Sequence, residues 1–193
     1  MNNTLTVENV RCDTAGRALV FDIWGLTFGN LYGHSGTDAR SRANREKCYA
    51  EVVPQLLTIR KHAGCIGGDF NSIMDKADAT HHPEAKLSGS LMRVTKVFDM
   101  KNSYRTMYPK VKDFSRYYGD SRGQGATRID TQYHFGDITI KEAEYFHLSF
   151  SDHHGIVVIN CLPDPLARIL CPKGSPSFKL RDDVINDQEF QQS

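Results

Sequence analysis

The stretch Gly64-Cys65-Ile66-Gly67-Gly68-Asp69-Phe70-Asn71 decides the fold class of this 193-residue chain. It is a short apolar run that ends in glycines, which predicts a strand leading into a loop. In extended backbone Asp69 and Asn71 lie on one face and Phe70 on the other. We therefore expect a carboxylate and an amide side by side at the carboxyl end of a strand, where open sheets tend to bind ligands. An Asx turn after a core strand is the alternative interpretation.

Strand and helix patterns alternate on both sides of this stretch. Residues 18–24 and 26–32 are rich in β-formers and are parted by Gly25, which predicts a hairpin. Residues 37–62 keep an approximate helical period that Pro54 should kink or split. The patterns further along predict a helix around residues 91–98 and strands at residues 114–118, 126–135, 145–150 and 155–162. Alternation of this kind predicts an α/β or α+β fold.

Composition is that of a globular protein, with 39% hydrophobic residues, 24% charged residues and a formal net charge of +1. No window reaches the ~18 apolar residues that a membrane span needs, and no secretory signal is evident. The five cysteines are odd in number and form no C-x-x-C pair, which argues against a disulfide framework and a zinc ribbon. We expect an intracellular protein, nuclear or cytoplasmic, with no membrane partner.

The length predicts one domain over residues 1–162. Beyond residue 162 the composition changes to prolines followed by a polar, acidic end. We therefore expect residues 163–193 to form a linker or tail.

Two further groups of residues could carry chemistry. The tetrad Ser151-Asp152-His153-His154 offers a hard oxygen ligand for a divalent ion and an imidazole that titrates near neutral pH, or else it is a solvated turn. In the alternating run 126–130, Arg128 and Asp130 would share a strand face, where they could serve a phosphate and a histidine respectively. An exposed ion pair is the alternative for these two residues.

The segment from Lys101 to Arg128 is locally basic. Seven Lys or Arg residues oppose two Asp residues there, a net charge of +5, and five aromatic residues lie among them. This combination suits a nucleic-acid backbone and its bases. A basic, solvated face over core aromatics is the alternative.

Four segments in this order resemble the exonuclease/endonuclease/phosphatase superfamily of metal-dependent phosphodiesterases, which includes apurinic endonucleases. They are LYGHSG (31–36), GGDFN (67–71), ATRID (126–130) and SDHHGI (151–156). Within that superfamily, NSYRTMYP (102–109) is similar to the Tyr-Arg-Thr-x-x-Pro segment of the endonuclease domain of LINE-type (non-LTR) retrotransposons. Residues 177–190 are similar to the segment that leads from that endonuclease into a reverse transcriptase. The resemblance spans about residues 19–190.

The resemblance implies a fold and a set of residue roles. The fold is a four-layer β-sandwich of two mixed sheets flanked by helices, with Mg²⁺ or Mn²⁺ as cofactor and DNA as partner. Asp69 would help activate water, Asn71 and Tyr32 would face the scissile phosphate, Asp130 would orient His153, and Asp152 would lie near the metal. Further phosphate or DNA contacts are expected at Ser35, Ser115, Arg128, Lys110, Lys112 and Arg116.

The chain departs from the family pattern at its beginning. The family opens with strands that carry an asparagine and a metal-binding glutamate, and both lie upstream of the segment where this sequence begins. Without that glutamate we expect weaker Mg²⁺ affinity. Two functions follow as hypotheses: a Mg²⁺-dependent DNA endonuclease impaired by an incomplete N-terminus, or a catalytically inactive retrotransposon-derived fragment that at most binds nucleic acid. A lipid or inositol-phosphate phosphatase is disfavoured by the 102–109 segment and the tail.

Overall fold

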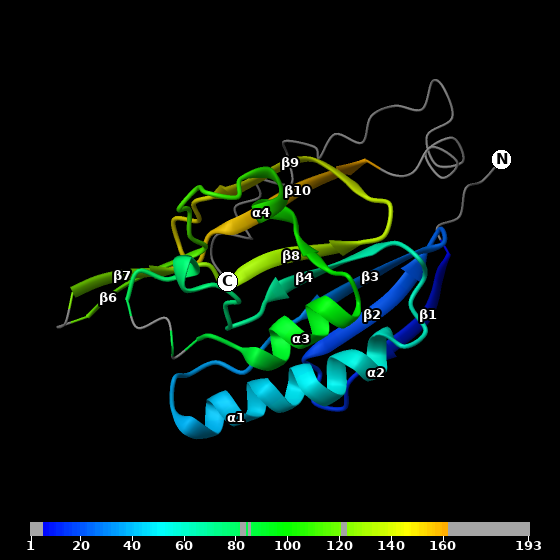
Figure 1. Cartoon of the computed structure of the whole chain (residues 1–193), viewed down its shortest axis with the longest axis horizontal. Helices are drawn as coiled ribbons and strands as arrows, with labels where there is room; N and C mark the ends of the chain where they lie inside the picture. The colour runs from blue at the N-terminus through cyan, green and yellow to red at the C-terminus, as the bar shows by residue number, and fades with distance from the viewer. Residues whose placement is uncertain (1–5, 82–83, 85, 121–122, 162–193) are drawn as a thin grey trace. The chain divides into compact units, whose positions relative to one another are not determined.

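The computed structural model describes residues 6–81, 84, 86–120 and 123–161 (Figure 1). The predicted tail, residues 163–193, lies outside these ranges. The main sheet is mixed, because β3 and β4 are parallel and the other neighbours are antiparallel. Its strands, in spatial order, are β1 (Val7–Cys12), β2 (Ala18–Ile23), β3 (Leu26–Leu31), β4 (Gly64–Asp69), β8 (Asp130–Phe135) and β5 (Lys101–Asn102).

The predicted hairpin and the predicted strand after it are confirmed as β2, β3 and β4. The sequence pattern did not predict the edge strand β1, because apolar and polar residues alternate poorly in it. Its residues are largely exposed. It is held by the fully buried Asp22 on β2, which accepts hydrogen bonds from Asn9 (2.8 Å) and Arg11 (3.1 Å). These hydrogen bonds to a buried carboxylate attach β1 to the sheet, because β1 buries little hydrophobic surface.

Helices cover one face of the main sheet (Figure 1). The helix predicted over residues 37–62 forms as α1 (Ala39–Lys47), a π-helical stretch (Cys48–Val52) and α2 (Val53–Leu57). Pro54, which lacks an amide hydrogen, lies in the first turn of α2, directly after the π-helical stretch. The helix predicted near residues 91–98 forms as α3 (Gly89–Val97), and the side chain of Ser88 caps it by accepting from Leu91 N at 3.0 Å.

A hydrophobic core fills the space between these helices and the sheet. Tyr49, Leu57 and Leu91 from the helices pack with residues of the sheet, all of them nearly or fully buried: Val20, Leu31, Ile66, Tyr133 and Phe135. Phe70 joins this core directly after β4, as predicted, and its ring meets that of Tyr133 edge to face, with the ring centres 5.0 Å apart. The core therefore anchors the residue between Asp69 and Asn71.

Smaller elements lie beside the main sheet, and Figure 1 shows β9, β10 and α4 on the side away from α1, α2 and α3. β9 (Thr139–Phe146) and β10 (Gly155–Cys161) form an antiparallel pair, α4 (Ser103–Met107) packs against β8 and β9, and β6 (Arg116–Asp120) and β7 (Gly123–Thr127) form a second hairpin. The strand expected at 126–135 is interrupted at Arg128 and Ile129, and the strand expected at 145–150 instead covers residues 139–146. The predicted class, a mixed α/β fold with helices flanking a multi-stranded sheet, is confirmed.

Within the described ranges, no helix combines the length and the apolar character required to cross a lipid bilayer. Cys12, Cys48, Cys65 and Cys161 are free thiols.

Candidate active site

The structure brings Asp69, Asp130 and His153 together. Asp69 ends β4 and Asp130 begins β8, and the two residues are partners in the antiparallel pairing of these strands. Figure 1 shows β4 and β8 side by side. His153 comes from the segment just before β10. One ligand atom of each residue lies within 4.8 Å of those of the other two, and all three side chains are half-buried. Three segments far apart in sequence thus form one acidic cluster with an imidazole.

The backbone at the end of β4 requires glycine. Gly68 has φ 138°, and a Cβ there would lie 2.1 Å from the carbonyl oxygen of Leu31. Gly33 N donates to Asp69 O at 2.7 Å, which ties the chain after β3 to the end of β4. Gly68 therefore lets β4 approach β3 closely enough to place the carboxylate of Asp69.

Asn71 is bound to Asp69 rather than open to solvent. Asn71 N donates to Asp69 Oδ1 at 2.7 Å, and the amide Nδ2 donates to Asp69 Oδ2 at 2.8 Å and to Gly33 O at 3.2 Å. Its side chain is buried. The Asx turn and the Asp–Asn pair are thus one arrangement, in which both amide hydrogens are used within the protein.

Asp130 and His153 form a hydrogen-bonded pair. His153 Nδ1 lies 2.9 Å from Asp130 Oδ2. Ser115 Oγ accepts from Ile129 N at 2.9 Å and from Asp130 N at 2.8 Å, and His154 N donates to Ser115 O at 2.6 Å. Ser115 is fully buried, so the phosphate contact predicted for it is corrected to a brace for the corner that carries Asp130.

The pKa values of both carboxylates in the cluster are raised, so a cation bound between them would be favourable. Burial, followed by the charge of Asp130, raises the pKa of Asp69 to about 6. Burial also raises the pKa of Asp130, although Ser115 and His153 oppose this rise. Two half-buried carboxylates with too little positive charge near them suit a hard divalent ion, because Mg²⁺ is commonly held by one or two carboxylates and water. Asp69 and Asp130 would hold such an ion, with His153 beside them.

Asp152 and Arg116 pair with each other in this structure. Arg116 Nε lies 2.8 Å from Asp152 Oδ2, and this hydrogen bond holds the pKa of Asp152 below its usual value. Asp152 is exposed and is not a member of the three-residue cluster. The residue predicted to lie near the metal and one predicted to contact phosphate thus pair with each other, and their predicted roles stay predictions.

Arg128 is not available for the phosphate contact predicted for it. Its side chain is fully buried, pairs with Asp78 at 3.2 Å and donates from Nε to Asp113 O at 2.7 Å. The guanidinium also lies over the ring of Tyr104, 4.7 Å from its centre. Because β7 ends at Thr127, the expected strand alternation does not reach Arg128, and the residue is a structural cation in the interior.

Tyr32 and Ser35 are exposed on the chain that follows β3. Arg17 lies over the Tyr32 ring, 5.3 Å from its centre. The intervening Gly33 is the residue whose amide donates to Asp69 O. Both residues therefore lie on a segment joined to the site by its backbone, and their predicted phosphate roles stay predictions.

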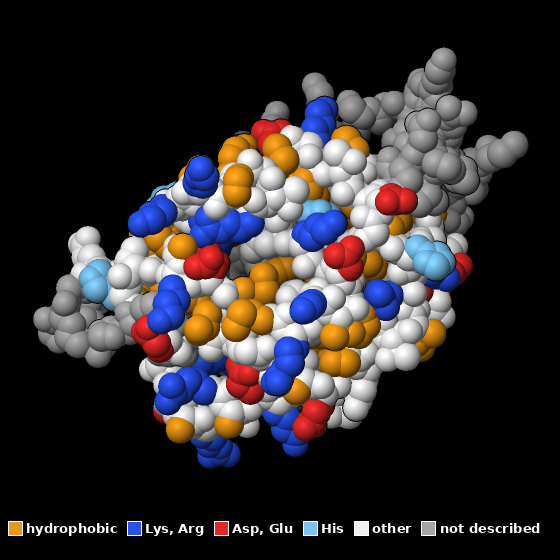
Figure 2. Space-filling model, in the orientation of Figure 1, with side chains coloured by type: hydrophobic (Ala, Val, Ile, Leu, Met, Phe, Trp, Pro, Cys, Tyr) orange, Lys and Arg blue, Asp and Glu red, His pale blue; other side chains and the backbone are white. Residues whose placement is uncertain are grey.

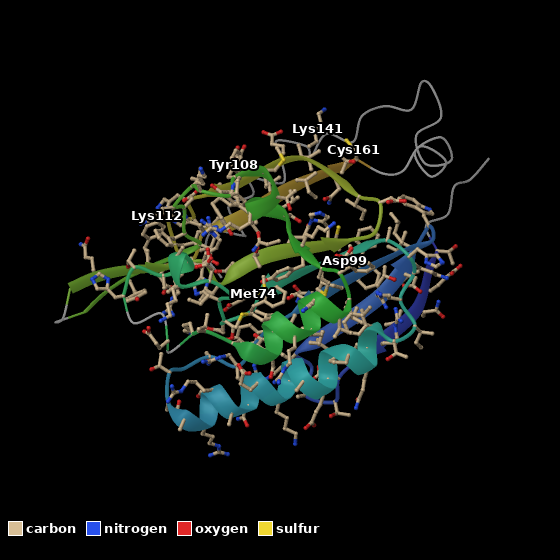
Figure 3. The ribbon with its side chains drawn as sticks, viewed as in Figure 1. Met74, Asp99, Tyr108, Lys112, Lys141 and Cys161 are labelled. Atoms are coloured by element: carbon tan, nitrogen blue, oxygen red, sulfur yellow. The ribbon has the colours of Figure 1, made fainter. Side chains whose placement is uncertain are left out.

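The basic segment divides into structural and exposed cations. Arg105 and Arg128 both pair with Asp78, and Tyr104 and Phe114 are buried. Lys110 and Lys112 are exposed in the loop between α4 and β6, where Figure 3 labels Lys112 and Tyr108 and Figure 2 shows Lys and Arg side chains gathered. Among the described residues of this segment, only some of the cationic side chains therefore face solvent.

Lys86 belongs to the site and was not singled out by the sequence. It is buried, and its Nζ lies 3.0 Å from Asn71 Oδ1. Burial lowers the pKa of Lys86 to about 8, assisted by the charge of Arg45 and opposed by that of Asp69. A lone lysine fifteen residues from Asn71 carries no pattern that marks it, because the contact depends on how the intervening segment returns to β4.

Comparison with known proteins identifies the fold. No family model matches the chain, and no curated protein matches it. Among solved structures, an AP endonuclease from Archaeoglobus fulgidus superposes with a TM-score of 0.64 at 16% identity, over 80% of this chain and 71% of that one. A 3′-5′ exonuclease from Neisseria meningitidis superposes with a TM-score of 0.63 at 16% identity, over 80% and 72% of the two chains.

A third structure, a 3′ phosphatase from Neisseria bound to a product DNA hairpin, superposes with a TM-score of 0.66 at 17% identity, over 82% of this chain and 72% of that one. The chain therefore shares its fold with an AP endonuclease, a 3′-5′ exonuclease and a 3′ phosphatase.

Proposed function

We propose that this chain is a nuclease domain that hydrolyses DNA phosphodiester bonds with Mg²⁺ or Mn²⁺. The observation that carries the proposal is the convergence of Asp69, Asp130 and His153, within 4.8 Å of one another, at the ends of β4 and β8. The fold, which the chain has in common with an AP endonuclease and a 3′-5′ exonuclease, supports the same reaction class.

The hydrogen bonds support a task for each side chain of the cluster. With Nδ1–H donated to Asp130, the imidazole of His153 has Nε2 left to exchange a proton or donate to a phosphoryl oxygen. Asp69, with its pKa raised to about 6, can orient a water or accept its proton near neutral pH. A divalent ion held by Asp69 and Asp130 would neutralise charge on the phosphoryl group.

The finer part of the proposal is an origin in a LINE-type retrotransposon. The sequence NSYRTMYP at residues 102–109, which covers α4, supports it, together with the resemblance of residues 177–190 to the approach to a reverse transcriptase. In such a parent protein the reverse transcriptase would follow this domain.

Nucleic-acid binding without hydrolysis is the second candidate. It is favoured by the small ligand set of the described cluster, two carboxylates and one imidazole, and by the pairing of Asp152 with Arg116. The exposed Lys110 and Lys112 would then provide the contacts to phosphate.

Nicking of supercoiled plasmid by the 193-residue chain tests both candidates. The reaction is run with Mg²⁺, Mn²⁺ or EDTA, beside the variants His153→Ala and Asp69→Ala. His62→Ala is the matched control, since His62 is an exposed histidine outside the cluster. Metal-dependent nicking that is lost in the first two variants and kept in the control supports the nuclease.

If the folded chain raises the fluorescence anisotropy of a labelled DNA duplex but does not nick plasmid, the result supports nucleic-acid binding without hydrolysis. If His153→Ala nicks plasmid as fast as wild type, the proposed active site is wrong.

A further inference from the structure

Lys86 is tied to the site by its backbone. Ile73, two residues after Asn71, forms a parallel bridge with Leu87. Ile73 N donates to Lys86 O at 2.9 Å, and Ser88 N donates to Ile73 O at 3.1 Å. The segment is therefore fixed alongside the residues that follow β4, and its lysine side chain extends toward Asn71.

The ammonium group holds the oxygen end of the Asn71 amide, whose nitrogen end is held by Asp69 and by Gly33 O. Lys86 Nζ donates to Oδ1 at 3.0 Å, so the amide nitrogen faces Asp69 Oδ2 at 2.8 Å. An ammonium has only donors and a carboxylate has only acceptors, so the reversed amide would set like against like at both ends. With the lysine present, one orientation satisfies both partners.

A buried lysine is costly unless charged or polar groups compensate it. Lys86 is 9% exposed, and its ammonium lies near the carboxylates of Asp69 and Asp130 and also within the field of Arg45 and Arg116. An apolar side chain of the same length would avoid that cost. The three-member chain from Lys86 through Asn71 to Asp69 is what compensates the charge, and it ends at the reactive carboxylate.

We propose that Lys86 is a positioning residue of the nuclease reaction, which locks the Asn71 amide so that both oxygens of Asp69 are held in place. The inference rests on the proposed function. It names a residue that acts through Asn71 rather than by contact with the substrate.

Kinetics of plasmid nicking by Lys86→Met and Lys86→Arg test the role. Methionine keeps the length and removes the donor, whereas arginine keeps a cationic donor. Loss of a residue that orients a reactive group typically costs roughly 10- to 100-fold in activity. We expect a loss of that size in kcat for Lys86→Met with KM unchanged, partial recovery in Lys86→Arg, and wild-type rates in Lys96→Met, whose lysine is exposed on α3.

A kcat equal to wild type in Lys86→Met overturns the proposal. A raised KM with unchanged kcat also overturns it, because Lys86 would then bind substrate directly.

A spectroscopic measurement keeps the inference independent of catalysis. The side-chain NH₂ cross-peaks of Asn71, assigned by their absence in Asn71→Ser, should shift in Lys86→Met and stay in place in Lys96→Met. If the wild-type chain does not nick DNA, the proposed function fails and these cross-peaks decide the positioning role alone. Unmoved cross-peaks in a folded Lys86→Met overturn that role.

Discussion

The buried charge of Asp69 should cost stability at neutral pH. Its pKa is raised from 3.8 to about 6, so between these values the folded chain binds more protons than the unfolded chain. Stability then falls as pH rises, because its slope with pH follows the unfolded minus the folded proton count. A difference of about 2.2 in pKa corresponds to about 3 kcal/mol lost by pH 7.5, of which about 1 kcal/mol is already lost at pH 4.5.

Asp69→Asn removes this dependence. Asparagine does not ionise, so the free energy of unfolding of wild type relative to the variant should fall by about 2 kcal/mol between pH 4.5 and pH 7.5. The variant also places an amide against Asn71 Nδ2, which donates to Asp69 Oδ2 in the wild type. That mismatch costs the same at every pH and therefore does not affect the comparison.

Urea unfolding of both proteins in EDTA at pH 4.5, 5.5, 6.5 and 7.5 measures the effect. His62→Ala serves as a surface control. Adding Mg²⁺ at pH 7.5 should stabilise the wild type more than Asp69→Asn, because an ion that binds only the folded site adds to its stability. If the free energy of unfolding changes with pH in the same way for wild type and Asp69→Asn, the pKa of Asp69 is not raised and this reasoning is wrong.

Three further outcomes are expected. Arg128→Ala should lower the free energy of unfolding by about 3–5 kcal/mol in a urea titration, because it leaves the buried carboxylate of Asp78 with less compensation; a loss below 1 kcal/mol would contradict the interior role. Gly68→Ala should cost about 2 kcal/mol or more and reduce nicking, because φ is 138° and a carbonyl oxygen lies 2.1 Å from the added Cβ; wild-type melting and rate would disprove the close approach. The double variant Lys110→Ala, Lys112→Ala should reduce the salt slope of DNA binding by about 2, and an unchanged slope would place the DNA elsewhere.

Local patterns were enough for much of the main sheet. The β2–β3 hairpin, β4 and α3 follow from short-range periodicity and glycine placement, which act within a few residues. The edge strand β1 could not be predicted, because its attachment depends on the buried Asp22. Pro54 predicts a kink or split in the helix over residues 37–62. The chain accommodates this proline with a π-helical stretch before α2, whose residues Cys48 and Tyr49 are buried in the core.

The sequence by itself determined that Asp69 and Asn71 lie together after a strand, since only Phe70 separates them. Only the tertiary structure decided which other charges serve the site. It buried Arg128 and Ser115 as structural supports, set Arg116 against Asp152, and brought Lys86 to Asn71. The physical reason is that the burial and the partner of a charged side chain depend on long-range packing, and the residue type and its neighbours in sequence do not carry that information.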